Sequence, residues 1–299
     1  AGRRIALDES PYVIAEIGSN HGGDGQRLED LIRAAATAGA SAIKLQKRDL
    51  ATWEREEPML WGSPYHSEHA FGPTYGEHRA ALELHPTAWV RVRELAAELG
   101  IAWFATPFDV PSLEFLAHYD MPAVKLASAS ITNVRLLCAA QAYGRPVILS
   151  TAGSDLAEIA SALDILRGVP VAILHCVALY PCPADALNLM AVVTLGRWFP
   201  GHVIGLSSHS EWLAEAPLAW DRGARIFEKH FTLSRSWKGS DQAWSLEPEG
   251  LRRYVRDLRQ CAAALGDGAK RLLAEERPAL EKMGRHDFAI KERDGGSQR

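Results

Sequence analysis

The sequence predicts an α/β protein folded as a single (β/α)8 (TIM) barrel. Short apolar runs rich in β-branched residues alternate with longer amphipathic segments from residue 12 to about residue 266, and the alternation repeats eight times. Strand–helix alternation favours a parallel sheet covered by helices, and eight repeats favour a closed barrel over an open doubly wound sheet. No G-x-G-x-x-G or G-x-x-x-x-G-K-[ST] loop stands where a nucleotide-binding open sheet would need one.

Each predicted strand is followed by a predicted helix. The strands are the apolar runs at residues 12–18, 42–46, 101–107, 123–128, 146–151, 171–177, 203–209 and 225–231. The segment 28–38 is typical of the helices, because Leu28, Leu31, Ile32 and Ala35 recur at helical spacing. Glycines stand between helix and next strand, where a helix C-cap favours them, at Gly39, Gly100, Gly144, Gly168, Gly201 and Gly223.

Two segments fall outside this regular pattern. Residues 47–85 form a long connection after the second strand, and its aromatic residues predict an ordered lid rather than a floppy linker. We expect the barrel domain to span residues 1–266 and a short C-terminal extension to span 267–299. The extension has one helical stretch at 269–283, interrupted by Pro278, and a polar end at 291–299 that we expect to be frayed.

Composition narrows the classes of function. The chain has 299 residues, is 47% hydrophobic and 23% charged, and carries a formal net charge of -4 with both signs interspersed. This balance does not indicate the concentrated positive charge that binding a nucleic-acid backbone requires. No apolar run reaches the roughly 18 residues needed to span a bilayer, and no signal-peptide pattern opens the sequence. The four cysteines include no C-x-x-C pair, which favours a reduced, cytoplasmic setting.

Polar residues gather where the predicted strands end, which is the catalytic end of a TIM barrel. The set consists of Glu16, Asn20, Lys44, Gln46, Thr106, Lys125, Ser128, Ser150, Tyr180, Ser207, His209, Glu228 and His230. Two lysines with several hydroxyls suit a phosphate or carboxylate. Two imidazoles on adjacent strands leave most of a divalent ion's coordination sphere open to water or substrate. The pattern therefore indicates an anionic small molecule bound beside a metal.

Several of these residue types also have purely structural interpretations. Lys44 or Lys125 could neutralise Glu16 or Glu228 as a buried ion pair. His175 and His202 fit hydrogen-bonded core histidines, and Asp109 with Ser112 fits a helix cap. Lys229 alternates out of phase with its neighbours, so we expect it to face the helix layer. The functional interpretation depends on the convergence of the set.

With these residues assembled, the chain resembles the sialic acid synthase (N-acetylneuraminate synthase) family over nearly its whole length. The matching phrases include Ile14-Ala15-Glu16-Ile17-Gly18-Ser19-Asn20-His21-Gly22, Ile43-Lys44-Leu45-Gln46, Ala105-Thr106-Pro107-Phe108-Asp109, Val124-Lys125-Leu126-Ala127-Ser128, Gly205-Leu206-Ser207-Ser208-His209, Glu228-Lys229-His230-Phe231 and Gly239-Ser240-Asp241. Many ordered motifs at strand ends make this a specific resemblance.

The resemblance implies condensation of phosphoenolpyruvate with an aldose aldehyde, giving a 2-keto-3-deoxy acid and phosphate. It implies a divalent metal, Mn²⁺ or Mg²⁺, on His209 and His230. The positions that match the phosphoenolpyruvate site are Lys44, Thr106, Lys125, Ser128, Ser150 and Ser207. Glu16, Tyr180 and Asp241 match acceptor-side positions, and Glu228 is a candidate for ordering the metal site or for proton transfer.

The chain also departs from the family pattern. The resemblance covers the barrel only, without the family's C-terminal antifreeze-like domain, so the family's tendency to dimerise makes a homodimer only one expectation. Ala178, Ser130 and Ser208 stand where the family usually has a polar residue, an acidic residue and an aspartate. Phosphoenolpyruvate-side positions are thus kept while acceptor-side positions have changed. This pattern predicts an acceptor other than N-acetylmannosamine.

Two other functions fit the same residues. A class I aldolase would use Lys125 or Lys44 as a Schiff base and would need a lysine with a depressed pKa. A catalytically inactive barrel could bind a sugar acid. A non-catalytic relative has no need of all five of the residues that this chain retains, which are Lys44, Lys125, His209, Glu228 and His230. Their joint retention argues against an inactive barrel.

Overall fold

The computed structural model describes residues 9–283 and has a closed barrel of eight strands in the order β1 to β8. Every strand pairs in parallel with the next, and β8 pairs with β1. The strands are β1 (Tyr12–Gly18), β2 (Ala42–Lys47), β3 (Ala102–Pro107), β4 (Val124–Leu126), β5 (Val147–Ser150), β6 (Val171–Cys176), β7 (Val203–Ser208) and β8 (Ile226–His230). The predicted (β/α)8 fold is confirmed.

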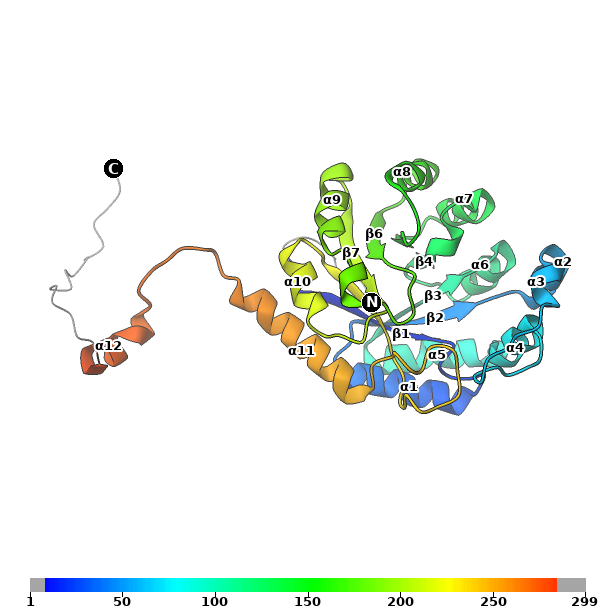
Figure 1. Cartoon of the computed structure of the whole chain (residues 1–299), viewed down its shortest axis with the longest axis horizontal. Helices are drawn as coiled ribbons and strands as arrows, with labels where there is room; N and C mark the ends of the chain where they lie inside the picture. The colour runs from blue at the N-terminus through cyan, green and yellow to red at the C-terminus, as the bar shows by residue number, and fades with distance from the viewer. Residues whose placement is uncertain (1–8, 284–299) are drawn as a thin grey trace. The chain divides into compact units, whose positions relative to one another are not determined.

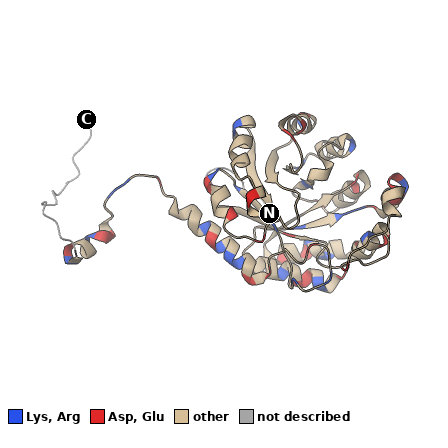
Figure 2. Ribbon diagram, viewed as in Figure 1, with Lys and Arg blue, Asp and Glu red and all other residues tan. Residues whose placement is uncertain are grey.

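Helices surround the ring of strands (Figure 1). They are α1 (Gly25–Thr37), α5 (Pro86–Leu99), α6 (Val110–Ala117), α7 (Val134–Tyr143), α8 (Leu156–Ile165), α9 (Met190–Trp198), α10 (Glu215–Asp221) and α11 (Pro248–Ala264), with short 3₁₀ turns η1 (Ser128–Ser130) and η2 (Ala184–Ala186). Lysines, arginines and acidic residues are interspersed along the outer helices, α11 among them (Figure 2).

About half of the long connection after β2 is helical. It contains α2 (Leu50–Glu56), α3 (Pro58–Trp61) and α4 (Tyr75–Leu82), which lie beyond the end of β2 (Figure 1). Asp49 caps α2, and Thr74 with Glu77 forms a capping box on α4. The ring of Trp61 packs where a Cβ on Gly76 would stand, since its nearest atoms lie 2.4 Å from that position. The close α3–α4 contact therefore requires glycine at this point.

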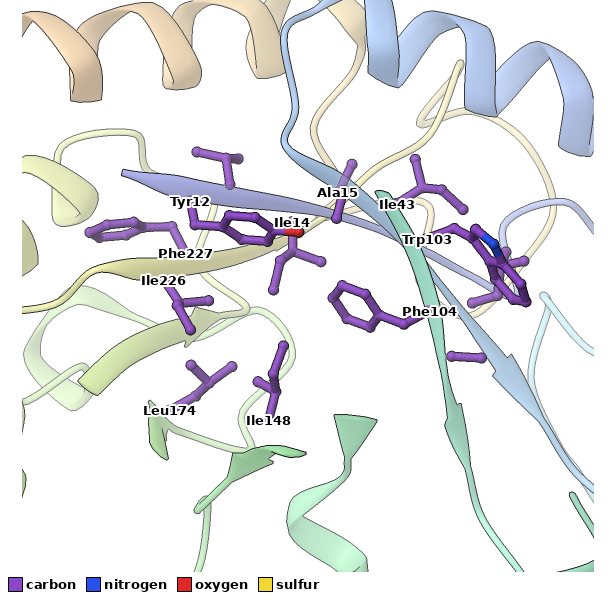
Figure 3. Close-up of a cluster of buried hydrophobic side chains, with 14 of the residues drawn as sticks. Tyr12, Ile14, Ala15, Ile43, Trp103, Phe104, Ile148, Leu174, Ile226 and Phe227 are labelled. Carbon is purple, nitrogen blue, oxygen red and sulfur yellow. The ribbon is translucent and has the colours of Figure 1, made fainter. Parts of the chain in front are cut away.

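Apolar side chains fill the barrel beneath the polar ends of the strands. Ile14, Phe104, Ile148, Leu174 and Ile226 converge from five strands (Figure 3), and each is at most 4% exposed. Such interior layers make a barrel a packed core rather than a pore.

The chain divides into two compact units, with the boundary between Ala262 and Ala263. In the second unit, residues 268–273 are not helical, and the helices are η3 (Ala274–Glu276) and α12 (Arg277–Met283). Pro278 lies in the first turn of α12, where a missing N–H costs nothing, so it starts a helix rather than interrupting one. The end predicted to be frayed, 291–299, lies outside the described residues. None of the helices within 9–283 has the length and apolar character required to cross a membrane.

Candidate active site

A cavity of about 610 Å³ opens at the carboxyl ends of the strands. Its wall contains most of the predicted site residues, namely Glu16, Lys44, Gln46, Thr106, Lys125, Ser128, Ser150, Tyr180, Ser207, His209, Glu228, His230 and Asp241. The register explains this convergence, because Glu16 is paired with Lys44 on one side and with His230 on the other. Parallel strands bring such inward-facing residues to one level.

One predicted residue is not in this wall. The side-chain amide of Asn20 donates to the Phe231 carbonyl and to Ser245 Oγ, both at 2.9 Å. Gln242 returns a hydrogen bond to the Asn20 carbonyl at 3.0 Å. Hydrogen bonds of Asn20 therefore join the segment after β1 to the segment after β8.

Two buried lysines and two buried carboxylates form the base of the cavity. Lys44 Nζ lies 2.8 Å from Glu16 Oε2 and 3.8 Å from Glu228 Oε1. Lys125 Nζ lies 3.8 Å from the same Glu228 oxygen. The structural interpretation of these lysines is thus partly met, since both have carboxylate neighbours. Both also remain in the wall of a cavity that the imidazoles share.

Burial and charge shift the ionisation of this cluster. Burial alone would lower the pKa of Lys44, but the carboxylates of Glu16 and Glu228 outweigh burial and raise it. Burial does lower the pKa of Lys125, with only partial compensation from Glu228 and with further lowering by Lys44. Burial would raise the pKa of Glu228, yet Lys125 and Lys44 hold it below its ordinary value. Of the two buried amines, Lys125 is therefore the one whose charge is less well compensated by neighbouring carboxylates.

Hydroxyl groups orient the lysines. Lys44 Nζ donates to Thr106 Oγ1 at 3.0 Å, and Lys125 Nζ donates to Ser150 Oγ at 2.7 Å. Ser207 Oγ donates to Glu228 Oε1 at 3.1 Å. Thr106 and Ser150 accept from the lysines, so each keeps its own proton to donate to an oxyanion placed beside them.

The two predicted metal ligands are adjacent. The ring centroids of His209 and His230 are 5.3 Å apart. Burial and the charge of His230 lower the pKa of His209 to about 4, so its imidazole is neutral near pH 7. His209 Nδ1 lies 3.0 Å from the Val177 carbonyl oxygen, which leaves Nε2 free when Nδ1 carries the proton.

These residues fit a metal only as an open, two-imidazole site. His230 Nδ1 is buried without a hydrogen-bond partner and lies 3.8 Å from Asp241 Oδ2. An imidazole nitrogen that lacks a hydrogen-bond partner is available as a metal ligand, and a nearby carboxylate suits a cation. Within residues 9–283, no group of three or more His, Cys, Asp or Glu side chains is arranged as a ready-made metal site.

Aromatic rings and an amide line the outer part of the cavity. Tyr180 packs on His209 with ring centroids 4.3 Å apart, and the ring centroids of Tyr180 and Trp244 are 5.7 Å apart. Gln46 donates to Glu16 Oε1 at 2.8 Å, which orients that carboxylate. Flat apolar faces beside hydrogen-bonding groups suit a sugar or a similar polyol.

The cavity wall also contains residues that the sequence analysis did not select. They are Arg48, Tyr65, Arg79, Phe108, Ala127, Ala129, Ala152, Cys176, Ser240 and Trp244, and Ala178, which the sequence marks as a departure from the family pattern, also lies in the wall. For Arg48 a signal existed, because it continues the alternation of Lys44 and Gln46 along β2. Arg79 gave no such signal, since it belongs to α4 inside the long connection.

The structural interpretations of the remaining residues agree with their contacts. His175 Nε2 and His202 Nδ1 lie within hydrogen-bond distance of the carbonyls of Leu187 and Val171. Asp109 caps α6 by accepting from the Ser112 N–H. Lys229 points to the helix layer, where it pairs with Glu215 at 2.6 Å. Ser208 Oγ donates to that same carboxylate, so it does not face the imidazoles.

A second cavity, of about 840 Å³, lies at the amino ends of the strands. Its lining is mostly apolar, with residues such as Phe104, Ile148 and Ile226, and Arg259 is its charged residue. Barrel enzymes use the carboxyl end of the strands for chemistry. The smaller cavity, which is lined by ionisable side chains, is therefore the candidate active site.

The fold and this cavity define the class of the protein: a (β/α)8 barrel with clustered ionisable side chains at the end where barrel enzymes bind their substrates. A profile of the NeuB family matches residues 31–270. The chain belongs to the NeuB family, as the resemblance to sialic acid synthases predicts.

Several relatives are named as synthases of N-acetylneuraminate-9-phosphate, of diacetyllegionaminic acid or of pseudaminic acid. N-acetylneuraminate-9-phosphate synthase of Mus musculus is 33% identical over 286 residues, which cover 95% of this chain and 79% of the relative. N,N'-diacetyllegionaminic acid synthase of Legionella pneumophila is 34% identical and covers 89% of this chain and 76% of the relative. A crystal structure of N-acetylneuraminic acid synthetase from Leptospira borgpetersenii, in complex with citrate, is 33% identical with a TM-score of 0.78, covering 92% of this chain and 91% of that one.

Proposed function

We propose that this chain condenses phosphoenolpyruvate with an aldose or other aldehyde in a metal-dependent reaction. The products are a 2-keto-3-deoxy sugar acid of the sialic acid type and inorganic phosphate. The observation that carries the proposal is that both lysines and both imidazoles line one cavity at the carboxyl end of the barrel. The names of the relatives, synthases of N-acetylneuraminate-9-phosphate and diacetyllegionaminic acid, support a sugar-acid product.

Lys44 and Lys125 bind the anionic substrate in this proposal. Their ammonium groups offset the carboxylate and phosphate of phosphoenolpyruvate, and Thr106, Ser150 and Ser207 orient its oxygens. Ser128 Oγ accepts from the Ala152 N–H at 2.9 Å and keeps its own proton to donate. The same groups stabilise the negative charge of the tetrahedral adduct that forms when water adds at C2 of phosphoenolpyruvate.

His209 and His230 would hold a divalent ion, Mn²⁺ or Mg²⁺, next to the acceptor. When bound, such an ion supplies Lewis acidity toward an aldehyde oxygen. Glu16, Gln46, Tyr180 and Asp241 bind the acceptor and aim its carbonyl carbon at C3 of phosphoenolpyruvate. Glu228 holds the two lysines in register, and its unpartnered Oε2 is available for proton transfer.

The acceptor in this proposal is not N-acetylmannosamine. Ala178 lines the cavity at a position where the resemblance implies a polar side chain. Ser130 is buried within η1, outside the cavity wall, where the resemblance implies an acid. The change at Ala178 therefore removes a polar group from the cavity wall.

The proposal is tested by phosphate release from phosphoenolpyruvate with Mn²⁺ across a panel of aldoses and other aldehydes. We expect release to require both an aldehyde and the metal, and the product mass to equal aldose plus pyruvic acid. His209→Ala and His230→Ala should lose the metal-dependent turnover, while His202→Ala, a matched histidine at the amino end of β7, should keep it. No release with any aldehyde, or full metal-free activity of both site variants, would contradict the proposal.

One observation favours the class I aldolase as a second candidate. Burial lowers the pKa of Lys125, which a Schiff-base lysine needs. Treatment with pyruvate and borohydride separates the two, because an aldolase would be trapped as a reduced adduct on Lys125 and the synthase forms no imine. An inactive sugar-acid-binding barrel predicts neither trapping nor phosphate release.

All of the proposed site residues lie between Glu16 and Asp241, so we propose that the barrel segment 1–266 contains the whole catalytic site. The four cysteines are free thiols, which agrees with the proposed cytoplasmic setting. Dimerisation of the chain stays a prediction.

A further inference from the structure

Two guanidinium groups line the acceptor side of the cavity without a carboxylate partner. Arg48 follows β2, and Arg79 lies on α4. Neither side chain forms an ion pair within 4 Å in the described part of the chain, whereas Lys44 and Lys125 both have carboxylate neighbours. Among the lysines and arginines of the cavity wall, these two arginines are therefore the ones that no carboxylate of residues 9–283 pairs with.

Arg48 is held rigidly in place. It is 5% exposed, and its guanidinium carbon lies 3.7 Å from the centroid of the Phe108 ring. Its Nη1 donates to Gln46 Oε1 at 3.2 Å, while its Nε is buried with no hydrogen-bond partner among residues 9–283. A buried guanidinium stacked on an aromatic face and left with unused donors is preorganised for an oxyanion.

Arg79 presents a second unsatisfied donor. Its Nε is buried and has no hydrogen-bond partner in the part of the chain that the structure describes, and its guanidinium carbon lies 5.0 Å from the centroid of the Tyr75 ring. Burial, followed by the nearby charge of Arg79, lowers the pKa of Arg48 to about 10. Two like charges are thus close enough to repel each other in the absence of a ligand.

The surrounding acids do not neutralise this pair. The Glu83 carboxylate is occupied by Lys47 Nζ at 3.1 Å and by the backbone N–H of Arg48 at 3.1 Å. The Asp241 carboxylate lies within 4 Å of His230 and of neither arginine. A buried guanidinium beside a second, partly buried one is costly without a counter-charge, and a bound anion removes that cost.

We propose that Arg48 and Arg79 form a second anion subsite, which binds a phosphate ester on the acceptor sugar at the end away from its aldehyde. This inference rests on the proposed condensing function. A phosphate monoester carries about −1.5 to −2 charge at pH 7, which matches two guanidinium groups, whereas a carboxylate would leave one of them uncompensated. The lysines opposite are left for the carboxylate and phosphate of phosphoenolpyruvate.

The experiment compares matched pairs of aldoses with and without a terminal phosphate, and it tests Arg48→Gln and Arg79→Gln. We expect the phosphorylated member of the best pair to have the higher kcat/KM. Each variant should reduce that preference about 10- to 150-fold, the range for losing a hydrogen bond to a charged group, and leave the KM for phosphoenolpyruvate unchanged. Arg55→Gln, an exposed arginine on α2 paired with Glu56, is the matched control and should behave as the unmodified chain does.

A binding measurement separates failure of this inference from failure of the proposed function. The reduced alditol phosphate and its unphosphorylated alditol cannot react, so calorimetry reports the subsite without turnover. Tighter binding of the phosphate, lost in Arg79→Gln and partly recovered in Arg79→Lys, supports the subsite even if no aldose is turned over. Equal affinity for the two alditols, or loss of phosphoenolpyruvate affinity in the arginine variants, would overturn it.

Discussion

Glu228 and the two lysines show how individual residues set the charge of the cavity. One oxygen of Glu228 lies 3.8 Å from both ammonium groups, while Glu16 pairs only with Lys44, at 2.8 Å. Lys44 thus has two carboxylate neighbours and Lys125 has one. Lys125 is the less compensated amine, since its carboxylate neighbour is 3.8 Å away. An incoming anion can therefore pair with Lys125 without breaking a close ion pair.

Replacing this amine should weaken binding of phosphoenolpyruvate. We expect Lys125→Met to cost about 2–5 kcal/mol of binding free energy, at least a roughly 30-fold loss of affinity, since it removes a charge from a desolvated site. Calorimetric titration in the absence of acceptor measures the effect directly. Lys270→Met, at an exposed lysine outside the barrel, is the control. Unchanged affinity in Lys125→Met would exclude the amine as an anion ligand.

At the scale of elements, β8 carries charge on both of its faces. Glu228 and His230 face the cavity, and Lys229 between them faces α10. Lys229 Nζ donates to Glu215 Oε1 at 2.6 Å, to Ser210 Oγ at 3.0 Å and to the Trp212 carbonyl at 3.1 Å. This buried cluster joins β8, which carries His230, to the segment that follows His209.

Breaking that ion pair on one side should destabilise the barrel. Lys229→Met leaves the Glu215 carboxylate buried and unpaired, for which we expect a loss of about 3–5 kcal/mol in the free energy of unfolding. The double variant Lys229→Met/Glu215→Leu removes both charges and should recover most of the loss. Urea unfolding of the four proteins in this double-mutant cycle measures the coupling. Arg252→Met, at an exposed pair on α11, should change stability little. A double variant no more stable than Lys229→Met would contradict this account.

The elements differ in how far the sequence predicts them. The eight strands are predictable because each is a buried apolar run between a helix end and a polar residue, and their observed bounds differ from the predicted ones by a few residues at most. The shortest, β4, ends at Leu126 because the chain turns into η1 at Ser128. Helices α2 to α4 are four to eight residues long and were not predicted individually. Segments this short depend on tertiary contacts rather than on periodicity.

At the scale of the whole molecule, the same contrast appears in the site. The residues on strands could be predicted, because a parallel barrel brings strand ends to one rim. Arg79, Tyr65 and Trp244 reach the cavity only because connecting segments fold over it, through contacts such as that of Gly76 with Trp61. No local pattern indicates that packing. Asn20 shows the opposite case, a polar residue near a strand end that is used to join two connections.

Buried neutral histidines make the stability of the whole barrel depend on pH. His21 Nδ1 accepts a hydrogen bond from the Gly23 N–H at 3.0 Å, and His78 Nδ1 accepts one from the Phe71 N–H at 3.1 Å. Burial lowers the pKa of each imidazole to about 4. Both contacts require an unprotonated Nδ1, so the folded chain resists protonation that the unfolded chain accepts near pH 6.5.

The contribution of these histidines to the free energy of unfolding should therefore be constant above about pH 7 and fall as the pH is lowered from about 6.5 toward 4. In this window the unfolded state binds more protons, at up to about 1.4 kcal/mol per pH unit for each such histidine. The lowered pKa of Glu228 affects stability only at lower pH, because its stabilisation is lost as the pH falls below the ordinary glutamate range.

Urea unfolding between pH 7.5 and about 5 in metal-free buffer measures the slope, to which His209 also contributes. His21→Asn keeps an acceptor near Nδ1 but cannot be protonated, so it should reduce the slope, while His85→Asn, at an exposed cap, should not. A slope unchanged by His21→Asn would show that this imidazole is not held neutral by the fold.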